Sequence, residues 1–357
     1  VILTATSGDT GKAALAGFAD VPGTKIIVFY PKNGVSPIQE KQMVTQKGAN
    51  TSVVAIHGNF DNAQSGVKAI FEDKDLAKEL DACGYQFSSA NSINIGRLVP
   101  QVAYYVYGYA KLVERGQIKA GDPVNIVVPT GNFGNILAAY YAGKMGIPVK
   151  KFICASNKNK VLTDFFNTGV YDINREFYLT NSPSMDILIS SNLERLLYHL
   201  SGNDGEEISR LMTALEQEKK YEVSDKIREG LKDFYGGFAT VEDTNETIGK
   251  MYRENGYLID THTAVAYKVY EDYVEETGDE TPAIIASTAS AYKFADSVAH
   301  SIGLGEESDG FAYVRALEKE TGVRVPKALK DLDKKEIRHK GVIEISQMPE
   351  AVEESVK

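Results

Sequence analysis

The sequence predicts a two-domain α/β protein built from parallel sheets that are flanked by helices. Short apolar runs rich in β-branched residues alternate with helical patterns from the first residues onward. Glycine-containing loops follow several of these runs, and a length of 357 residues favours two domains over one. We expect a small α/β domain over residues 1–92 and a larger domain over 93–357, with a helical insertion at about 184–256 and the functional site in the cleft between the domains.

The elements follow from periodicity in chain order. Strands are predicted where apolar, β-branched residues form short runs, at 1–6, 25–30, 52–56, 86–90, 124–128, 152–155 and 283–286. Helices are predicted where apolar residues recur every three or four positions, at 13–19, 37–46, 61–80, 98–114 and 206–220. Ser36 is a suitable cap for the second of these helices. From Glu306 onward we expect a polar, helical segment.

Composition excludes several function classes. The formal charge is −10, which argues against nucleic-acid partners and anionic membrane surfaces. No apolar run approaches the length of a membrane span. The two cysteines, Cys83 and Cys154, lie far apart and outside any metal-ligand spacing, so we expect no metal site and a reducing, cytoplasmic location.

The loop Ser7-Gly-Asp-Thr10 follows the first predicted strand and precedes a helix. It does not fit a nucleotide P-loop, because Thr6 stands where the first glycine belongs and Ala13 where a hydroxyl is required. A turn of this kind still offers backbone N–H groups and the positive end of a helix to an anion. A phosphate, a carboxylate, or an ordinary capped βα turn without a ligand all remain compatible with it.

A second glycine loop, at residues 129–135, links the predicted strand at 124–128 to a helix. Gly131 and Gly134 permit a close approach to a helix N-terminus, which is typical of phosphate binding. The Gly-x-Gly pair of dinucleotide sites is absent, so the loop fits one phosphate better than a pyrophosphate.

Three further groups of polar residues stand out. The segment 91–97 places two Asn, a Ser and an Arg together, which suits an oxyanion or, alternatively, an Asx turn that opens the next helix. The segment 287–293 follows an apolar strand, at the end where open α/β sheets bind ligands. Asp260-Thr-His-Thr263 precedes a helix, and we expect a structural role for His262.

Seven segments in order identify a family. They are TATSGDTGKAAL, YPKNGVSPIQEKQM, SSANSINIGR, PTGNFGNILAAYYA, SPSMDILISSNLERLL, GYLIDTHTAVAY and STASAYKF. Together they resemble threonine synthases, which are fold type II (tryptophan synthase beta-like) pyridoxal-phosphate enzymes, and the similarity runs from Val1 to about Leu304. The family usually has His-Pro-Ala-Lys where this chain has Ser290-Ala-Tyr-Lys293.

The resemblance implies a reaction and a set of site residues. Threonine synthases convert O-phosphohomoserine and water to threonine and phosphate. The cofactor pyridoxal 5'-phosphate would be bound by residues of the larger, cofactor-binding domain and by Asp9 of the small domain; those of the larger domain are Gly131, Asn132, Phe133, Gly134, Asn135 and Thr288. The substrate would be bound by Ser7, Gly8, Thr10, Ser92, Asn94, Arg97 and Lys293. Asp9, facing the cofactor ring, and Thr288, meeting the pyridine nitrogen, are the candidate catalytic residues.

One element of the family is missing from the sequence. Its Schiff-base lysine lies upstream of the Ser-Gly-Asp-Thr loop, and Lys12, Lys32, Lys41 and Lys293 do not match its motif. We therefore expect an N-terminally truncated chain that is inactive by itself. The alternatives are another fold type II enzyme, namely threonine dehydratase or cysteine synthase, and a structural fragment without activity. Neither alternative enzyme needs to hold a substrate phosphate at 91–97. The sequence does not predict an oligomeric state.

Overall fold

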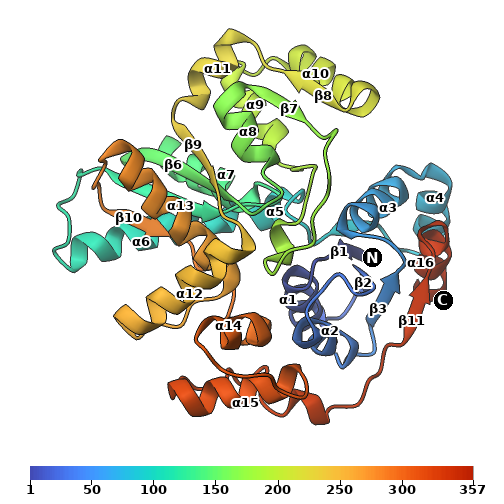
Figure 1. Ribbon diagram of the computed structural model, residues 1–357. Coiled ribbons are helices and arrows are strands. Elements are labelled where there is room, and N and C mark those ends of the chain that lie inside the picture. Colours follow the sequence, from blue (N-terminus) through green and yellow to red (C-terminus); the bar gives the residue numbers. More distant parts are fainter. Residues whose placement is uncertain (357) are drawn as a thin grey trace. The chain divides into compact units, whose positions relative to one another are not determined.

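The computed structural model describes residues 1–356, which divide into two compact units. Unit 1 comprises Val1–Asn94 together with Ser290–Lys357, and unit 2 comprises Ile95–Ala289 (Figure 1). The first boundary lies close to the predicted one. The sequence predicts that residues 290–357 belong to the second domain, whereas the contacts of the described residues 290–356 group them with the first.

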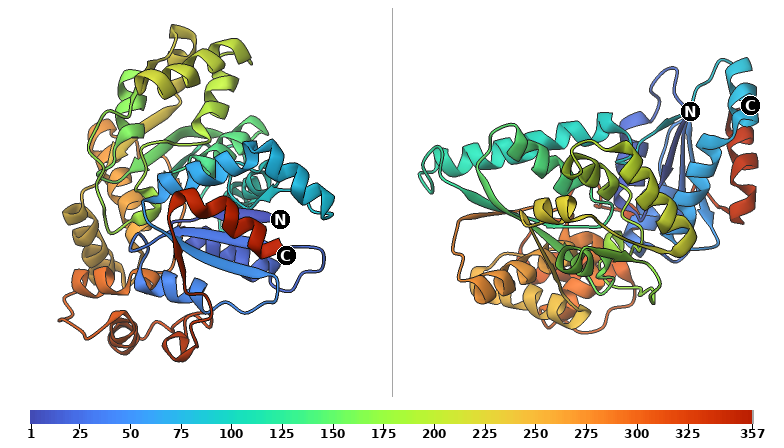
Figure 2. Two further views of the ribbon diagram at one scale, coloured as in Figure 1. Left: turned by 90° about the vertical axis from the view of Figure 1, so that its right-hand side faces the viewer. Right: turned by 90° about the horizontal axis from the view of Figure 1, so that it is seen from above.

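Unit 1 contains a parallel sheet. Its elements are β1 (Ile2–Ala5), α1 (Asp9–Phe18), β2 (Ile26–Pro31), α2 (Pro37–Val44), β3 (Thr51–Ile56), α3 (Phe60–Glu72), α4 (Lys74–Ala82), β4 (Ser88–Ser89), η3 (Ala291–Phe294), α14 (Ala295–Ser301), α15 (Gly310–Thr321), η4 (Leu332–Lys334), β11 (Gly341–Ile343), η5 (Ile345–Gln347) and α16 (Met348–Val356). Within the described residues the strand order is β11-β3-β2-β1-β4, and every pairing is parallel. Helices lie on both sides of this sheet (Figure 2).

The packing of unit 1 explains which of its strands and helices could be predicted from the sequence. All six residues of β2 are buried, because apolar side chains face the helices on both sides of the sheet. Ser36 caps α2 as predicted and forms a reciprocal capping box with Gln39. The helix predicted at 61–80 is in fact two helices. Asp73 adopts an extended conformation and caps α4 by accepting hydrogen bonds from the backbone of Asp75 and Leu76.

Residues 290–356 join unit 1 through a strand that the sequence pattern did not reveal. The short strand β11 pairs in parallel with β3, with Gly341 opposite Val54. Helix α16 then packs on α3, where the sulfur of Met348 would lie 2.5 Å from a Cβ placed on Gly66. The side chains of Met348 and Val352 are buried there. This segment therefore completes the sheet of unit 1.

Unit 2 contains a second parallel sheet. Its elements are α5 (Ile95–Leu98), η1 (Val99–Gln101), α6 (Val102–Glu114), β5 (Val124–Pro129), α7 (Gly134–Lys144), β6 (Val149–Ser156), α8 (Val161–Thr168), β7 (Val170–Asp172), η2 (Pro183–Met185), α9 (Leu193–Leu200), α10 (Gly205–Glu218), β8 (Lys220–Glu222), α11 (Asp225–Leu231), β9 (Phe234–Phe238), α12 (Val241–Asn255), α13 (Thr261–Thr277) and β10 (Ala283–Ile285). The order over the described residues is β10-β5-β6-β9, again all parallel. Helix α13 packs against β5, β6 and β9 and buries Val265 and Val269.

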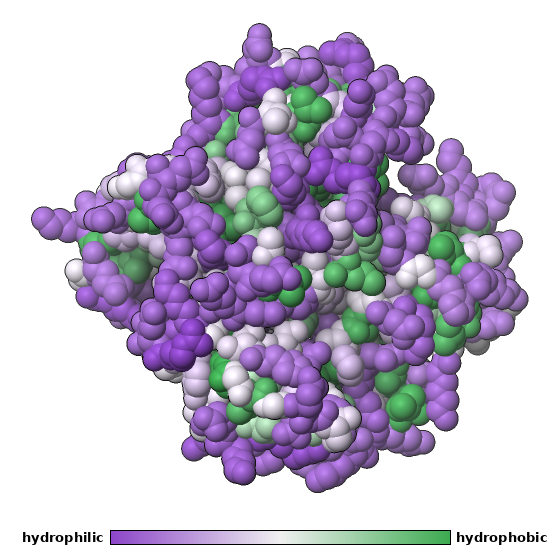
Figure 3. Space-filling model, viewed as in Figure 1, coloured by the Kyte–Doolittle hydropathy of each residue, from purple (hydrophilic) through white to green (hydrophobic). Residues whose placement is uncertain are grey.

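The segment 184–256, expected to be a helical insertion, also supplies a strand of this sheet. Strand β9 reads Phe-Tyr-Gly-Gly-Phe and lacks the β-branched run of the other strands. Its glycines are required by close packing, because a Cβ on Gly236 would lie 3.0 Å from the Cα of Thr163. On the face shown in Figure 3, hydrophilic residues cover most of each unit and apolar groups are small. None of the helices in residues 1–356 combines the length and apolar character needed to cross a membrane.

Candidate active site

The carboxyl ends of β5 and β10 bring two of the predicted site segments to one edge of the unit 2 sheet. The two strands are parallel neighbours, with Ile284 opposite Ile126. The backbone N–H of Ala286 extends this pairing by donating to Val127 O at 2.9 Å. The glycine loop after β5 and the Ser287-Thr288 pair after β10 therefore leave the sheet at the same edge, where open α/β sheets bind ligands.

The glycine loop after β5 has the geometry of an anion cradle. Phe133 is left-handed, with φ 63°, and immediately precedes α7. Its side chain is buried and stacks on Phe166, with ring centroids 6.0 Å apart. The strain of a left-handed non-glycine residue is thus offset by apolar burial. This conformation directs the loop into the N-terminus of α7, where backbone N–H groups are available to an anion.

A polar segment behind the loop fixes its carbonyl groups. Ser190 Oγ donates to Gly131 O at 2.6 Å. The backbone and side-chain amides of Asn192 both donate to Asn132 O, at 3.1 and 2.8 Å. Since the C=O and N–H of one trans peptide point in opposite directions, these bonds turn the N–H groups of Asn132 and Phe133 toward the other side of the loop.

Two more contacts hold the ends of the loop. The phenol of Tyr105 donates to the Asn135 side-chain oxygen. At the other end, a Cβ on Gly131 would lie 2.5 Å from the carbonyl oxygen of Ser184, so only glycine fits between the loop and the segment 182–186. The structure thus places Gly131, Asn132, Phe133, Gly134 and Asn135 together in one constrained loop.

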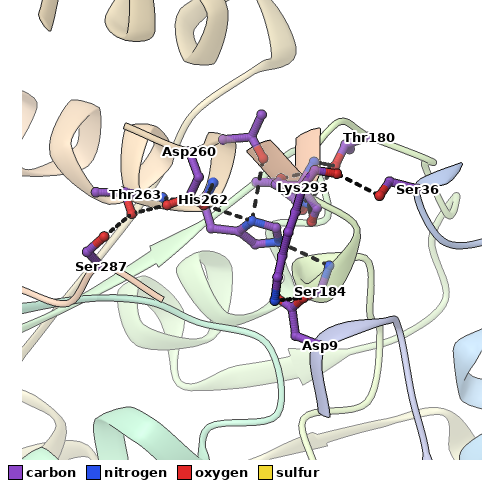
Figure 4. Close-up of polar contacts among 12 residues, drawn as sticks. Asp9, Ser36, Thr180, Ser184, Asp260, His262, Thr263, Ser287 and Lys293 are labelled. Carbon is purple, nitrogen blue, oxygen red and sulfur yellow. Dashed lines mark hydrogen bonds and ion pairs between the residues drawn. The ribbon is translucent and has the colours of Figure 1, made fainter. Parts of the chain in front are cut away.

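Thr288 stands beside a chain of hydroxyl groups that ends on a buried carboxylate. The Thr263 hydroxyl donates to Asp260 Oδ2 and contacts Ser287 Oγ at 3.1 Å (Figure 4). Thr263 is the donor in both contacts, so its single hydroxyl proton is shared between the Asp260 carboxylate and Ser287 Oγ. Thr288 follows Ser287 directly in the sequence and takes no part in these two contacts.

Asp260 is charged despite its burial. Burial raises the pKa of this carboxyl, but hydrogen bonds from His262 and Thr263 outweigh it and hold the pKa below its ordinary value. The same carboxylate caps α13 by accepting from the backbone of His262 and Thr263.

The Ser7-Gly-Asp-Thr10 loop of unit 1 is a capped turn built around a buried threonine. Thr6 Oγ1 accepts hydrogen bonds from the backbone of Gly8 at 2.9 Å and of Gly11 at 2.8 Å. Gly8 is left-handed, with φ 127°, and a Cβ there would lie 2.4 Å from the Gln39 side chain. This loop requires glycine on both counts. Ser7 and Thr10 flank that turn at the start of α1.

Asp9 and Lys293, which the resemblance places near cofactor and substrate respectively, form an ion pair. The ammonium of Lys293 donates to Asp9 Oδ1 at 2.6 Å (Figure 4). Gln39 Nε2 donates to the same oxygen at 2.9 Å. Ser36 donates to the backbone carbonyl of Lys293 at 2.6 Å. Nearby, burial and the charges of Lys335 and Lys293 lower the pKa of Lys12. The ammonium of Lys293 therefore lies beside the Ser7–Thr10 loop within unit 1.

The polar side chains of the segment 91–97 form hydrogen bonds within the fold itself. Asn91 makes two hydrogen bonds to the backbone of Ala5, at 3.0 and 2.7 Å, and Asn94 donates to Ser89 O at 2.8 Å. Ser92 and Asn94 belong to unit 1, whereas Arg97 belongs to unit 2. Burial lowers the pKa of Arg97, yet a guanidinium remains cationic at neutral pH. The shared role of these three residues toward substrate stays a prediction.

The residues that sequence reasoning missed are those that hold the loop from behind. Ser190, Asn192 and Tyr105 belong to quoted or helical segments, yet no role was assigned to them. The sequence signal for a supporting role was the run of small polar residues just before the apolar helix α9. Asn192 in this run is fully buried, and a buried amide needs hydrogen-bond partners. In residues 1–356 there is no cluster of His, Cys, Asp and Glu that could hold a metal ion.

Comparisons with known proteins agree with this geometry. A family model described as pyridoxal-phosphate dependent enzyme matches residues 1–288, and one described as threonine synthase, C-terminal, matches residues 263–356. Threonine synthase-like 1 of Pongo abelii is 44% identical over 314 residues, which cover 86% of this chain and 42% of that protein. The chain thus spans less than half the length of this relative.

Threonine synthases give longer matches. That of Saccharomyces cerevisiae is 36% identical over 372 aligned residues, covering 99% of this chain and 69% of that protein. The crystal structure of pyridoxal-phosphate-bound threonine synthase from Brucella melitensis superposes with a TM-score of 0.81 at 34% identity, covering 99% of this chain and 69% of that one.

These matches confirm the predicted α/β fold and the cofactor, pyridoxal 5'-phosphate. The chain belongs to the threonine synthase family of pyridoxal-phosphate-dependent enzymes.

Proposed function

We propose that this chain carries the cofactor-phosphate and substrate-binding parts of a threonine synthase, which converts O-phosphohomoserine and water to L-threonine and phosphate. The observation that carries the proposal is the loop 131–135, whose carbonyls are held from behind by Ser190 and Asn192. That loop shares a sheet edge with Thr288. Free thiols at Cys83 and Cys154 fit the cytoplasmic location that forms part of the proposal.

The residues present fit the phosphate of the cofactor. Gly131 lets the loop pack against the carbonyl oxygen of Ser184, which a Cβ would approach within 2.5 Å, and Asn132 and Phe133 direct their N–H groups away from the supporting segment. When bound, pyridoxal phosphate supplies an electron sink that makes protons beside the amino-bearing carbon of a substrate removable. In our assignment Thr288 holds its hydroxyl proton toward the pyridine nitrogen, while Lys293 neutralises Asp9 beside the Ser7–Thr10 loop.

Arg97 is proposed to bind the substrate phosphate together with Ser92 and Asn94. Substituting Arg97→Ala should weaken binding of O-phosphohomoserine by roughly ten- to a hundredfold, the value of one charge-assisted hydrogen bond. Affinity for pyridoxal phosphate should change little. Calorimetric titration of both ligands measures the two effects, and Arg210→Ala on the exposed face of α10 is the matched control. Equal weakening for both ligands would show that the two phosphate sites are misassigned.

Turnover by the chain itself is a separate question. We expect no release of phosphate from O-phosphohomoserine, because the four lysines named above do not match the family motif and three of them are engaged elsewhere. Lys293 is paired with Asp9, Lys12 donates to Gln46 at 2.6 Å, and Lys32 donates to Glu40 at 3.0 Å. A colorimetric phosphate assay with added pyridoxal phosphate tests this. Turnover that is abolished by Lys293→Met or Lys12→Met would instead identify a catalytic lysine within this chain. Release of pyruvate or 2-oxobutanoate from serine or threonine would favour a dehydratase.

A further inference from the structure

We propose that His262 is a positioning residue for the cofactor-phosphate loop, acting through the backbone of Ser184. The proposal rests on the cofactor role proposed above for residues 131–135, and it assigns to His262 a role beyond the structural one expected from the sequence. Its basis is a continuous series of contacts in unit 2. The series runs from Asp260 through His262 to Ser184 (Figure 4), and from Ser184 to Gly131.

The hydrogen bonds around His262 define which ring nitrogen carries the proton. Nδ1 lies 3.2 Å from Asp260 Oδ1, and a carboxylate there can only accept. Nε2 lies 3.2 Å from the backbone nitrogen of Ser184, which can only donate. Both contacts are satisfied at once only by the neutral imidazole with its proton on Nδ1. The side chain is 2% exposed, so water does not compete for either nitrogen.

Ser184 transmits this constraint to the loop. Its N–H is held by His262, and its carbonyl oxygen lies against Gly131, where a Cβ would approach within 2.5 Å. Gly131 is fixed from its other side by Ser190, which donates to its carbonyl at 2.6 Å. The first residue of the loop is therefore held between two supports, one of which depends on an acceptor nitrogen at His262.

The segment that contains Ser184 has a second anchor farther along. Asp186 accepts hydrogen bonds from Asn157, Asn159 and Thr180, so residues 180–186 are tied to the end of β6. That anchor does not set the position of the Ser184 N–H itself. We therefore expect loss of the His262 acceptor to loosen the contact with Gly131 while the fold of unit 2 persists.

A pair of substitutions separates positioning from simple packing. In His262→Gln, the side-chain oxygen can reach the place of Nε2 and accept from Ser184. In His262→Asn, the shorter amide can still donate to Asp260 but leaves Ser184 without this acceptor. We expect His262→Asn to weaken equilibrium binding of pyridoxal phosphate by about tenfold or more, and His262→Gln to restore affinity to within about threefold of the unaltered chain. Tyr273→Phe, a buried change farther along α13, is the control and should leave affinity unchanged.

Two readouts need no cofactor. Long-range ¹⁵N–¹H correlation spectra of the five histidines should show a neutral His262 protonated on Nδ1, identified by its loss in the Gln variant. Hydrogen exchange of the Ser184 amide should accelerate in His262→Asn and not in His262→Gln. Protonation on Nε2, or equal exchange rates in the two variants, would overturn the proposal.

The affinity measurements then decide the role toward the cofactor. Weakening in both variants to the same extent would show that His262 acts through packing alone, and no weakening in either would remove it from the site. Absence of pyridoxal-phosphate binding by the unaltered chain, with both cofactor-free results as expected, would contradict the proposed function while supporting the local contact between His262 and Ser184.

Discussion

Gly131→Ala should abolish most of the affinity of this chain for pyridoxal phosphate. The added methyl group would lie 2.5 Å from the carbonyl oxygen of Ser184, which is a backbone atom and cannot turn aside as a flexible side chain would. The loop cannot yield easily either, since Ser190 and Asn192 hold the carbonyls of Gly131 and Asn132. Overpacking of this kind costs about 1–3 kcal/mol of stability.

Binding should weaken in addition to stability, because displaced backbone N–H groups no longer point at the phosphate. We expect a dissociation constant for pyridoxal phosphate at least about thirtyfold higher, corresponding to roughly 2 kcal/mol, measured by fluorescence titration. Gly205→Ala at the start of α10 is the matched control, since a Cβ there meets no atom within 4 Å. Binding by Gly131→Ala at the level of the unaltered chain would remove the loop from the cofactor site.

Asp186→Ala should produce the largest loss of stability among the polar substitutions considered. The carboxylate is buried, and one of its oxygens accepts from Asn157 at 2.7 Å, Asn159 at 3.0 Å and Thr180 Oγ1 at 2.8 Å. The other oxygen accepts from the Thr180 backbone at 2.9 Å. Alanine would leave several buried donors without this acceptor, and each such group costs about 1–3 kcal/mol.

We therefore expect the free energy of unfolding to fall by roughly 3 kcal/mol or more, read from the midpoint of urea unfolding followed by circular dichroism. Asp225→Ala, at an exposed position in the first turn of α11, should change it by no more than about 0.5 kcal/mol. Burial raises the pKa of Asp186 despite these hydrogen bonds, so the site tolerates its charge only because the donors are present. A midpoint for Asp186→Ala equal to that of the control would mean that water replaces the carboxylate at no cost.

Local patterns predicted the strands that form the centres of the two sheets. The β-branched runs at 25–30 and 124–128 became β2 and β5, because a strand buried on both faces needs apolar residues at nearly every position. The loop at 129–135 was also predicted as an anion site from its glycines and its place between strand and helix.

Features set by distant contacts were not predictable from local patterns. Strand β9 contains adjacent glycines because α8 and α13 approach it closely, and no short-range pattern reports that approach. The contact of Asp9 with Lys293 joins residues 284 positions apart, and the support of Gly131 by Ser190 spans 59. Such pairings depend on the folded topology, so Ser190 and Asn192 behind the loop could not be predicted from local sequence, whereas the loop residues could be proposed from it.

The pairing of β11 with β3 has a consequence for the order in which the protein is made. Unit 2 is contiguous, so all four strands of its sheet have been synthesised once residue 289 is added. The edge of β3 must wait for residues 341–343, with its hydrogen-bonding groups open to other chains meanwhile. During translation, unit 1 is therefore the part of the nascent chain that most needs protection from aggregation, although its first strands leave the ribosome earliest.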